Sequence, residues 1–402
     1  RRASSTHEQT ARDRRRSMTS TATAQLRRRI ARNWHRLNGP GRVAGVDLAR
    51  GLAVLGMLAA HLLWLGSLSW TEPSTWGSVV TGRSSILFAA LAGVSLGLST
   101  GGPTPPHGAG LGRARLRVTI RALLIWLLGV LLISFDVPAA IILPTYAIIF
   151  VLTLPLLAQR ASRLFLAAAI VVLVTSPLIV WANASPWWES YKGWLLGLYI
   201  GWNYPFPLWI AFTLAGLGLA RAGIRSRRVQ WAALSVGALL AVAGYSLSPG
   251  PESSEQTAGR SFLEAWWTSD PHSSGVLEAI GSGGFAIAVI GLCLLLRTGG
   301  RWPWLTFPLR SVGSMPLTAY VLQIVMWAVA SMTLLGSAHE HAFRDLDPFL
   351  PITIATVMLS VAWSLLVGQG PLEAALGRLS LIGGPPASSG ANTQQRQNTL
   401  EP

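Results

Sequence analysis

The stretch GVDLARGLAVLGMLAAHLLW, residues 45–64, is long and apolar enough to decide the fold. A helix of this length crosses the ~30 Å hydrocarbon core of a bilayer. Apolar runs of similar length recur along the 402-residue chain, which is 51% hydrophobic and only 12% charged, with a mean hydropathy of +0.45. A soluble domain carries roughly twice that charged fraction. The sequence therefore predicts an all-α, polytopic membrane protein.

Apolar runs of helical length predict a bundle of about ten membrane-spanning helices. They cover roughly residues 43–66, 80–100, 118–135, 138–157, 163–183, 203–220, 229–248, 275–296, 311–335 and 349–368. These spans make residues 43–380 one transmembrane domain. Residues 1–42 form a basic arm that we expect to be disordered, although QLRRRIARNWHRL at 25–37 also has the pattern of a basic amphipathic helix on anionic lipid. Residues 381–402 are polar and rich in Gly, Pro and Ser, so we expect a disordered tail.

The net charge of +16 is distributed asymmetrically between the segments that connect the spans. Of the 32 Lys and Arg residues, 27 lie on one side of the spans, three lie on the other side, and Arg50 and Arg83 lie within spans. Positive residues mark the cytoplasmic side of a membrane protein. This pattern places both termini in the cytoplasm and explains the basic charge without a nucleic-acid partner. Only Lys192 is a lysine, a bias typical of high-GC bacterial genes, so we expect a bacterial inner membrane.

The single cysteine, Cys293, excludes disulfides and cysteine-based metal sites. The sequence also has no nucleotide-binding P-loop, no cluster of metal ligands and no serine-hydrolase elbow. We therefore expect chemistry that needs no metal. The sequence leaves the oligomeric state open.

Three ionisable residues interrupt the first span: Asp47, Arg50 and His61. At 100° and 1.5 Å per residue, Arg50 lies about 60° around the helix from Asp47. His61 returns to within about 40° of Asp47 and lies roughly 21 Å further along the axis. Charged groups in a membrane face a bundle interior or a wet cavity, so we expect this polar stripe to line a path through the protein. Two structural alternatives stay open: an ion pair of Asp47 with Arg50, and a hydrogen-bonded packing role for His61.

The spacing of this stripe resembles the first-helix signature of a known family. DLARGLAVLGMLAAH, residues 47–61, is similar to the first helix of membrane-bound acyltransferase family three, the O-acetyltransferases of bacterial surface glycans. The shared features are an Asp, an Arg-Gly pair after it, and a His near the end of the helix. The resemblance implies that His61 is the catalytic base and that Arg50 is required.

Longer stretches resemble a second branch of the transmembrane acyltransferase superfamily, which contains heparan-α-glucosaminide N-acetyltransferase and bacterial relatives. They are GRSSILFAALAGVSLGL in the second span, GSMPLTAYVLQ at 313–323 and GQGPLEAALGRL at 368–379. In the glucosaminide enzyme the position of His61 is an Asn, and the catalytic His lies in the outward loop that follows. The ungapped equivalent of that His is Glu72, which makes Glu72 the reserve candidate for the base.

Acyl transfer to a sugar hydroxyl or amine needs a group that accepts the acceptor's proton, and an imidazole with a pKa of about 6.5 suits this task. His61 could instead become acylated itself in a two-step relay, and the spacing does not separate the two mechanisms. Arg83, followed by Ser84 and Ser85 at the outer start of the second span, is a candidate donor to the thioester oxygen. A snorkelling interfacial arginine is the alternative for Arg83.

Four arginines lie in RARLRVTIR, on the cytoplasmic side of the third span: Arg113, Arg115, Arg117 and Arg121. Acetyl-CoA and other acyl-CoA molecules are made in the cytoplasm and carry several phosphates, which these arginines are placed to bind by charge. The positive-inside rule alone also explains them.

The ninth span contains Pro316, which removes one backbone donor and opens the helix locally. Tyr320 and Gln323 follow it at helical spacing on the same face. Both are candidates for the substrate cavity, with hydrogen bonding between helices as the alternative.

These features predict an integral membrane acyltransferase. It would transfer an acetyl or short acyl group from cytoplasmic acyl-CoA to a sugar hydroxyl or amine of an envelope glycan, glycolipid or metabolite at the outer face. The alternative from another class is a proton-coupled transporter or flippase, with Asp47 and His61 as relay groups. A transporter more typically shows inverted repeats or paired broken helices, and only the ninth span is interrupted in this sequence.

Overall fold

A computed structural model describes residues 23–39, 41–69, 71–248, 261–296, 302–339 and 341–381. Within these ranges the chain is helical and contains no strand. Contacts within the chain divide it into two compact units. The first unit comprises Arg1–Ser84 and Leu292–Glu373, and the second comprises Ser85–Gly291 and Ala374–Pro402.

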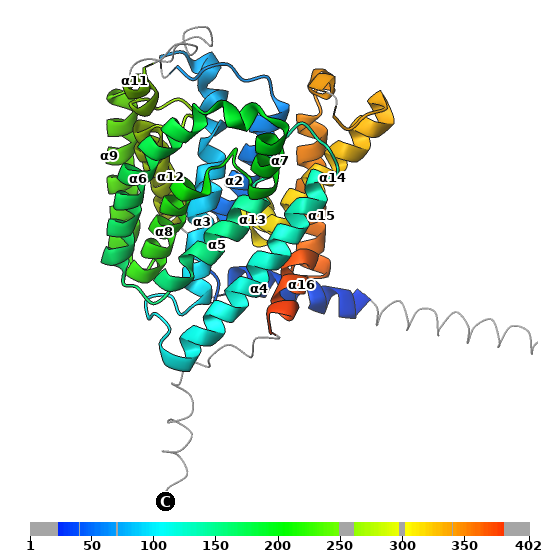
Figure 1. The fold of residues 1–402 in the computed structure, drawn as a ribbon. Coiled ribbons are helices and arrows are strands. Elements are labelled where there is room, and N and C mark those ends of the chain that lie inside the picture. The colour runs from blue at the N-terminus through cyan, green and yellow to red at the C-terminus, as the bar shows by residue number, and fades with distance from the viewer. Residues whose placement is uncertain are drawn as a thin grey trace, which may run out of the picture. The chain divides into compact units, whose positions relative to one another are not determined.

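The first unit is built around α2 (Ala44–Leu62). Figure 1 shows α2 beside its main neighbours, which are α13 (Trp302–Ser314), α14 (Pro316–Leu335) and α15 (Phe349–Leu366). Shorter elements complete the unit: the helical residues 23–38, η1 (Pro73–Val80), η4 (His341–Leu346) and the start of α16 (Pro371–Ser380). Most of α2 is buried, as expected for a membrane helix whose ionisable residues must face protein.

The second unit contains all or most of each remaining long helix. They are α3 (Arg83–Ser99), α4 (Gly108–Ile133), α5 (Leu143–Thr153), α6 (Ala161–Asn183), α8 (Phe206–Ala222), α9 (Arg227–Ser246) and α12 (Val276–Leu295). Shorter helices connect them: η2 (Leu154–Leu156), η3 (Pro186–Glu189), α7 (Tyr191–Ile200) and α11 (Phe262–Trp266). Within this unit α6 packs along α8, and α4 packs against α5 (Figure 1).

Eight helices of the described residues are long and apolar enough to cross a membrane. Two shorter apolar helices, Leu143–Leu156 and Phe206–Ala222, lie where the sequence predicts the fourth and sixth spans. The prediction of a polytopic helical bundle is therefore confirmed, with eight candidate spans and two shorter apolar helices in place of ten full-length spans.

The ninth predicted span, residues 311–335, is not one helix. α13 ends at Ser314 and α14 begins at Pro316, so the chain is broken at Met315 (φ −138°, ψ 56°). Proline lacks a backbone N–H and has a fixed φ, and it therefore favours the first position of a new helix. The residues before the break form α13, a separate helix of 13 residues that the hydropathy pattern did not predict.

The N-terminal arm differs in part from the expected disordered segment. Residues 23–38 are helical, and Asn33 and Leu37 are buried against the first unit. In this part of the arm the chain is therefore helical, as the amphipathic pattern of residues 25–37 indicates, and not disordered. Residues 1–22, and residues 382–402 of the expected tail, lie outside the described residues.

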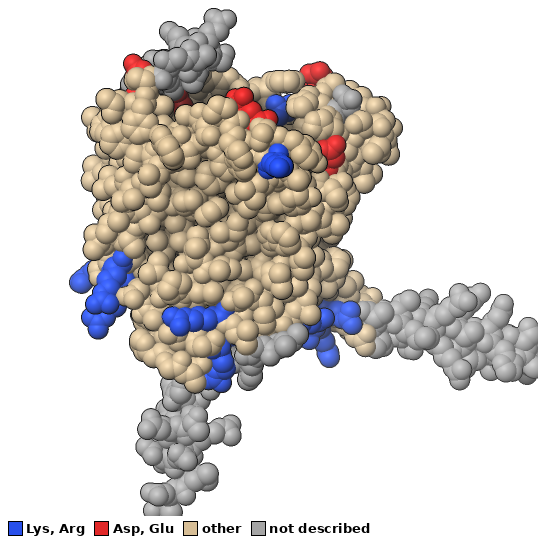
Figure 2. All heavy atoms as spheres, viewed as in Figure 1, with Lys and Arg blue, Asp and Glu red and all other residues tan. Residues whose placement is uncertain are grey.

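Basic side chains of the second unit gather at one end of its helices. Figure 2 shows Lys and Arg side chains at the lower ends of α4, α6 and α9, and Asp or Glu side chains near α11, at the opposite ends. The sequence explains this arrangement, because Arg160 precedes α6, Arg221 lies in the last turn of α8 and Arg227 begins α9. The expectation that both termini lie in the cytoplasm rests on this asymmetric distribution of positive charge.

Helices α3 and α8 approach each other closely at a glycine. A Cβ atom on Gly93 would lie 1.9 Å from the carbonyl oxygen of Thr213 and 2.8 Å from the backbone nitrogen of Leu217. We expect Gly93→Ala to lower the free energy of unfolding by about 2–3 kcal/mol, because backbone atoms cannot move aside as a flexible side chain would. Thermal unfolding of the purified protein in detergent measures this loss.

Gly112→Ala is the matched control for this prediction. Nothing lies within 4 Å of a Cβ atom added at Gly112 in α4, and alanine stabilises a helix interior by up to ~1 kcal/mol relative to glycine. Gly112→Ala should therefore leave the protein as stable as the wild type, or slightly more stable. An equal loss in both variants would contradict the close approach of α3 and α8.

Candidate active site

Asp47 is the centre of a charged cluster in the first turn of α2, and it is only 2% exposed. Its Oδ1 atom accepts hydrogen bonds from Nη2 of Arg42 and from Nη1 of Arg50, each at 3.1 Å. Nε of Arg42 contacts the second carboxylate oxygen. The ion pair of Asp47 with Arg50 is therefore present, and Arg42 is a third member that was not predicted.

The cluster lies at the break between α13 and α14. Arg42 also donates a hydrogen bond to the carbonyl oxygen of Ser314, at 3.2 Å. Beyond the break, the Glu373 carboxylate accepts hydrogen bonds from the backbone nitrogens of Leu317 (2.8 Å) and Thr318 (3.2 Å). These are two of the N–H groups that the start of a helix leaves unpaired. The contacts fix the start of α2 to the end of α13 and hold the start of α14.

His61 lies in the last turn of α2, roughly 21 Å along the helix axis from Asp47. The centroid of its ring is 6.4 Å from that of Trp327 in α14. The three residues of the polar stripe therefore belong to two separate sites at opposite ends of α2. Asp47 and Arg50 contact each other at one end of α2, and His61 lies at the other end beside an aromatic residue of α14.

Gln323 and Trp327 lie one turn apart on the face of α14 that also carries the buried Tyr320. Gln323 is 2% exposed and Trp327 is 1% exposed. Neither Nε2 of Gln323 nor Nε1 of Trp327 has a hydrogen-bond acceptor in the part of the chain that the structure describes. A buried N–H group without a partner costs about 1–3 kcal/mol. Two such donors on the helix that flanks His61 are suited to hold an oxygen atom of a ligand.

Arg83 and Ser84 begin α3 close to α2. A Cβ atom on Gly56 would lie 2.2 Å from Oγ of Ser84, so Ser84 packs directly on the backbone of α2. Arg83 is 5% exposed, and its Nη1 lies 3.5 Å from the carbonyl oxygen of Thr81. A snorkelling arginine would keep its guanidinium in water. The burial of Arg83 therefore favours a role inside the protein.

The two remaining polar candidates near these helices lie in different surroundings. Ser85 is the first residue of the second unit, where its carbonyl oxygen accepts a hydrogen bond from Oη of Tyr146 at 3.4 Å. Glu72, the reserve candidate for the base, precedes η1 and is exposed. Water competes with a bound acceptor for an exposed carboxylate, whereas His61 is partly enclosed. His61 is thus the better placed of the two candidates.

The four arginines of α4 divide between different faces of the helix. Arg117 and Arg121, one turn apart, line a pocket of about 170 Å³ with the end of α3 and the end of α16. Nε of Arg115 instead donates to the carbonyl oxygen of Leu154 at 3.2 Å, and Arg113 is exposed. Arg117 and Arg121 therefore share a concave site that suits a phosphate group, and Arg113 and Arg115 do not line it.

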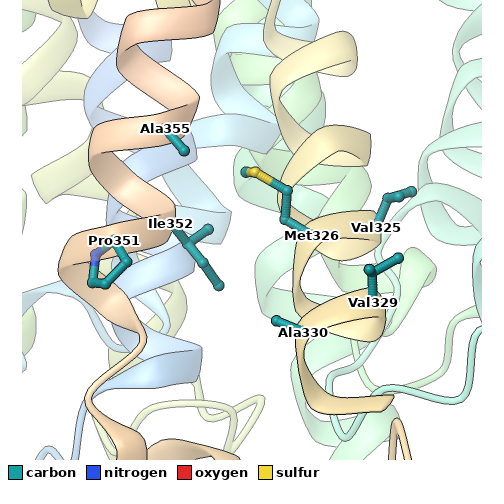
Figure 3. A pocket seen from close by; sticks show the side chains of 7 residues that line it. All are labelled: Val325, Met326, Val329, Ala330, Pro351, Ile352 and Ala355. Atoms are coloured by element: carbon teal, nitrogen blue, oxygen red, sulfur yellow. The ribbon is translucent and has the colours of Figure 1, made fainter. Parts of the chain in front are cut away.

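A groove of about 390 Å³ between α14 and α15 offers no such chemistry. Figure 3 shows its lining, which consists of Val325, Met326, Val329, Ala330, Pro351, Ile352 and Ala355. None of these side chains can bind a phosphate or accept a proton. The groove is therefore not part of the candidate active site.

Three residues of these sites were not predicted: Arg42, Trp327 and Glu373. Trp327 does have a signal in the sequence, because it follows Tyr320 and Gln323 at helical spacing on one face. Arg42 lies just before the first turn of α2, so its side chain can reach forward to the carboxylate of Asp47. Glu373 reaches Leu317 across a long separation in sequence, and local spacing carries no signal for such a contact.

Residues 42–248 match the family described as heparan-alpha-glucosaminide N-acetyltransferase, catalytic. Residues 219–382 match a second family, described as a protein of unknown function (DUF418). Neither a curated protein nor a solved structure matches the sequence. The resemblance of α2 to acyltransferase family three is not tested by these matches and stays a prediction. Because the first match covers more than half of the 402 residues, the chain belongs to the heparan-alpha-glucosaminide N-acetyltransferase catalytic-domain family and is a multi-pass membrane protein of the acetyltransferase type.

Proposed function

We propose that this protein transfers an acetyl or other short acyl group from cytoplasmic acyl-CoA to an acceptor at the outer face of a bacterial inner membrane. The acceptor is a sugar hydroxyl or amine of an envelope glycan, a glycolipid or a metabolite. The observation that carries the proposal is the position of His61 of α2 beside Trp327 of α14, in a chain of an acetyltransferase family. Among the described residues, the buried Nε1 of Trp327 and Nε2 of Gln323 have no acceptor.

In this mechanism His61 is the general base. Its imidazole accepts the proton of the acceptor hydroxyl or amine while the acceptor atom forms a bond to the thioester carbonyl carbon. Hydrogen bonds from Gln323 and Trp327 stabilise the negative charge that develops on the carbonyl oxygen, with the buried Arg83 and the adjacent Ser84 as a second donor set. The C–S bond then breaks, and the CoA thiolate takes the proton from His61.

A covalent relay is the alternative mechanism at the same residue. The imidazole nitrogen of His61 would attack the thioester and release CoA, and the acyl-imidazole would then react with the acceptor. The relay and the direct transfer differ in the order in which bonds form and break, but the same residues donate hydrogen bonds to the carbonyl oxygen in both. The two mechanisms are separated by whether label stays on the protein when no acceptor is present.

The remaining candidate residues bind the donor or hold the helices in place. The pocket lined by Arg117 and Arg121 suits a phosphate group of acyl-CoA, and Arg113 and Arg115 add positive charge to the same helix. Asp47 and Arg50 position the start of α2, which carries His61. No step of the mechanism requires a metal ion. The arginine-rich helix ends support the expected orientation, with both termini in the cytoplasm.

Inverted membrane vesicles that contain the protein test this function. Acetyl-labelled CoA is added to the medium, which faces the cytoplasmic side, and a panel of envelope glycans, amino sugars and glycolipids is enclosed in the vesicle lumen. Free CoA and labelled acceptor are then measured. We expect acceptor-dependent release of CoA that vesicles without the protein do not show.

Two other results would contradict the proposal. Hydrolysis of acetyl-CoA without any labelled acceptor would make the protein a thioesterase. Intact acetyl-CoA together with movement of an acceptor that stops when the proton gradient is collapsed would favour the transporter or flippase instead.

A further inference from the structure

The C-terminal half of the helix of residues 23–38 is held against α13 and α15. Leu37 and Asn33 are buried, and Nδ2 of Asn33 donates to the carbonyl oxygen of Leu365 at 2.8 Å. Arg310 of α13 donates to the carbonyl oxygen of Leu37 at 2.6 Å and to Oδ1 of Asn38 at 2.9 Å. These hydrogen bonds fix the position and direction of the helix.

An aromatic contact extends this attachment to the start of α13. The rings of Trp34 and Trp304 are stacked with their centroids 4.1 Å apart. Trp304 is nevertheless 68% exposed, and its neighbours Trp302 and Leu305 are exposed as well. α13 has 13 residues, so it is only ~20 Å long and too short to span a bilayer. Exposed tryptophans on such a helix are typical of the membrane–water interface.

The N-terminal half of the same helix has few protein neighbours. Residues 23–29, 31 and 32 are all exposed, so a segment of ~15 Å projects beyond the packed half. An isolated helix of this length is marginal in water, and it needs a partner to stay helical. The segment carries four arginines (Arg27, Arg28, Arg29 and Arg32), and no acidic residue occurs within 23–39.

The arrangement of side chains on this segment identifies the partner's chemistry. Gln25, Arg28, Arg29 and Arg32 share one face by their spacing, and we call them the arginine face. Leu26 and Ile30 lie on the other side, in line with Trp34 and Leu37 at helical spacing. An apolar stripe beside a basic face is the pattern of a helix that lies in the headgroup layer of a membrane.

We infer that the projecting half of this helix binds the headgroups of anionic phospholipids through the arginine face. Guanidinium groups form charge-assisted hydrogen bonds to phosphate oxygens, while Leu26 and Ile30 enter the upper part of the acyl chains. The tryptophans at the start of α13 lie in the same layer. This lipid site does not depend on acyl transfer, and it holds for a transporter as well as for an enzyme.

A fluorophore on the apolar stripe tests the inference in the full-length protein. Leu26→Cys is labelled with an environment-sensitive dye, and the unmutated chain is the labelling control because Cys293 is buried. The protein is placed in nanodiscs of phosphatidylcholine, either alone or with a third of phosphatidylglycerol. Quenching by neutral acrylamide reports how far the dye is protected from water.

We expect protection in the anionic nanodiscs and its loss in 0.5 M NaCl, because salt screens exposed charges. Each arginine near an anionic surface contributes about 1 kcal/mol. The triple variant R28Q/R29Q/R32Q should therefore shift the equilibrium between bound and free helix by about 100-fold. The matched control is R225Q/R227Q/R228Q, which removes three exposed arginines before and at the start of α9 and should leave the protection unchanged.

Three results would overturn the inference. One is equal protection in neutral and anionic nanodiscs. Another is loss of protection in the α9 control, which would show a general effect of net charge. The third is protection that requires added RNA rather than phosphatidylglycerol, which would assign the arginine face to nucleic acid. Size-exclusion profiles of all variants verify that they are folded.

Discussion

His61→Ala is expected to lower the rate of acyl transfer by about 10²–10⁴-fold, the range that a general base contributes. No other side chain of α2 can replace the imidazole as the base. The carboxylate of Asp47 lies roughly 21 Å away along the helix and is held by two arginines. The affinity for acyl-CoA should change little, because a base acts on the transition state rather than on the bound donor. Turnover in proteoliposomes and binding of acyl-CoA to the purified variant measure the two quantities separately.

Glu72→Gln is the control that decides between the two candidates for the base. Glu72 is exposed, so we expect this variant to retain the wild-type rate within a factor of about three, which is less than 1 kcal/mol. Loss of transfer in Glu72→Gln with full activity in His61→Ala would assign the base to Glu72. Labelled protein in the wild type that is absent from His61→Ala, with no acceptor added, would establish the covalent relay.

The positions of most spans could be predicted because hydropathy is a local property of the sequence. The interruption at Pro316 was visible as well, since a proline lacks the N–H group that a continuous helix needs. The sequence did not indicate that the residues before Pro316 form a separate helix, α13. α13 has polar residues and two prolines among its tryptophans, and a window of about 20 residues does not detect such a short helix.

The candidate site could be predicted only where one helix carries it. The spacing on α2 correctly places Asp47 and Arg50 in contact and His61 at the other end. Helical spacing also indicates that Arg115 does not share a face with Arg117 and Arg121, because it lies about 200° around the helix from Arg117. No spacing rule of this kind predicts which residues of two different helices are in contact. Trp327 beside His61 became evident only once α2 and α14 were placed together.

Asp47→Ala is expected to be the most destabilising single substitution in the charged cluster. The variant leaves Arg42 and Arg50 without the carboxylate that both contact. Removing one partner of a buried ion pair costs about 3–5 kcal/mol, and we expect about 3 kcal/mol because the arginine side chains keep some contact with water. The fraction of monodisperse protein that survives heating in detergent measures the loss.

The physical reason for this loss can be tested by removing a positive charge together with Asp47. If uncompensated arginines cause the instability, the double variant Asp47→Ala/Arg42→Gln should be more stable than Asp47→Ala alone, because the effects of contacting residues are not additive. A double variant that is no more stable than the single one would contradict this explanation. Asp47→Asn separates structure from chemistry. If it folds like the wild type but transfers no acyl group, Asp47 acts on the substrate, whereas equal losses of stability and activity would leave Asp47 as the residue that positions α2.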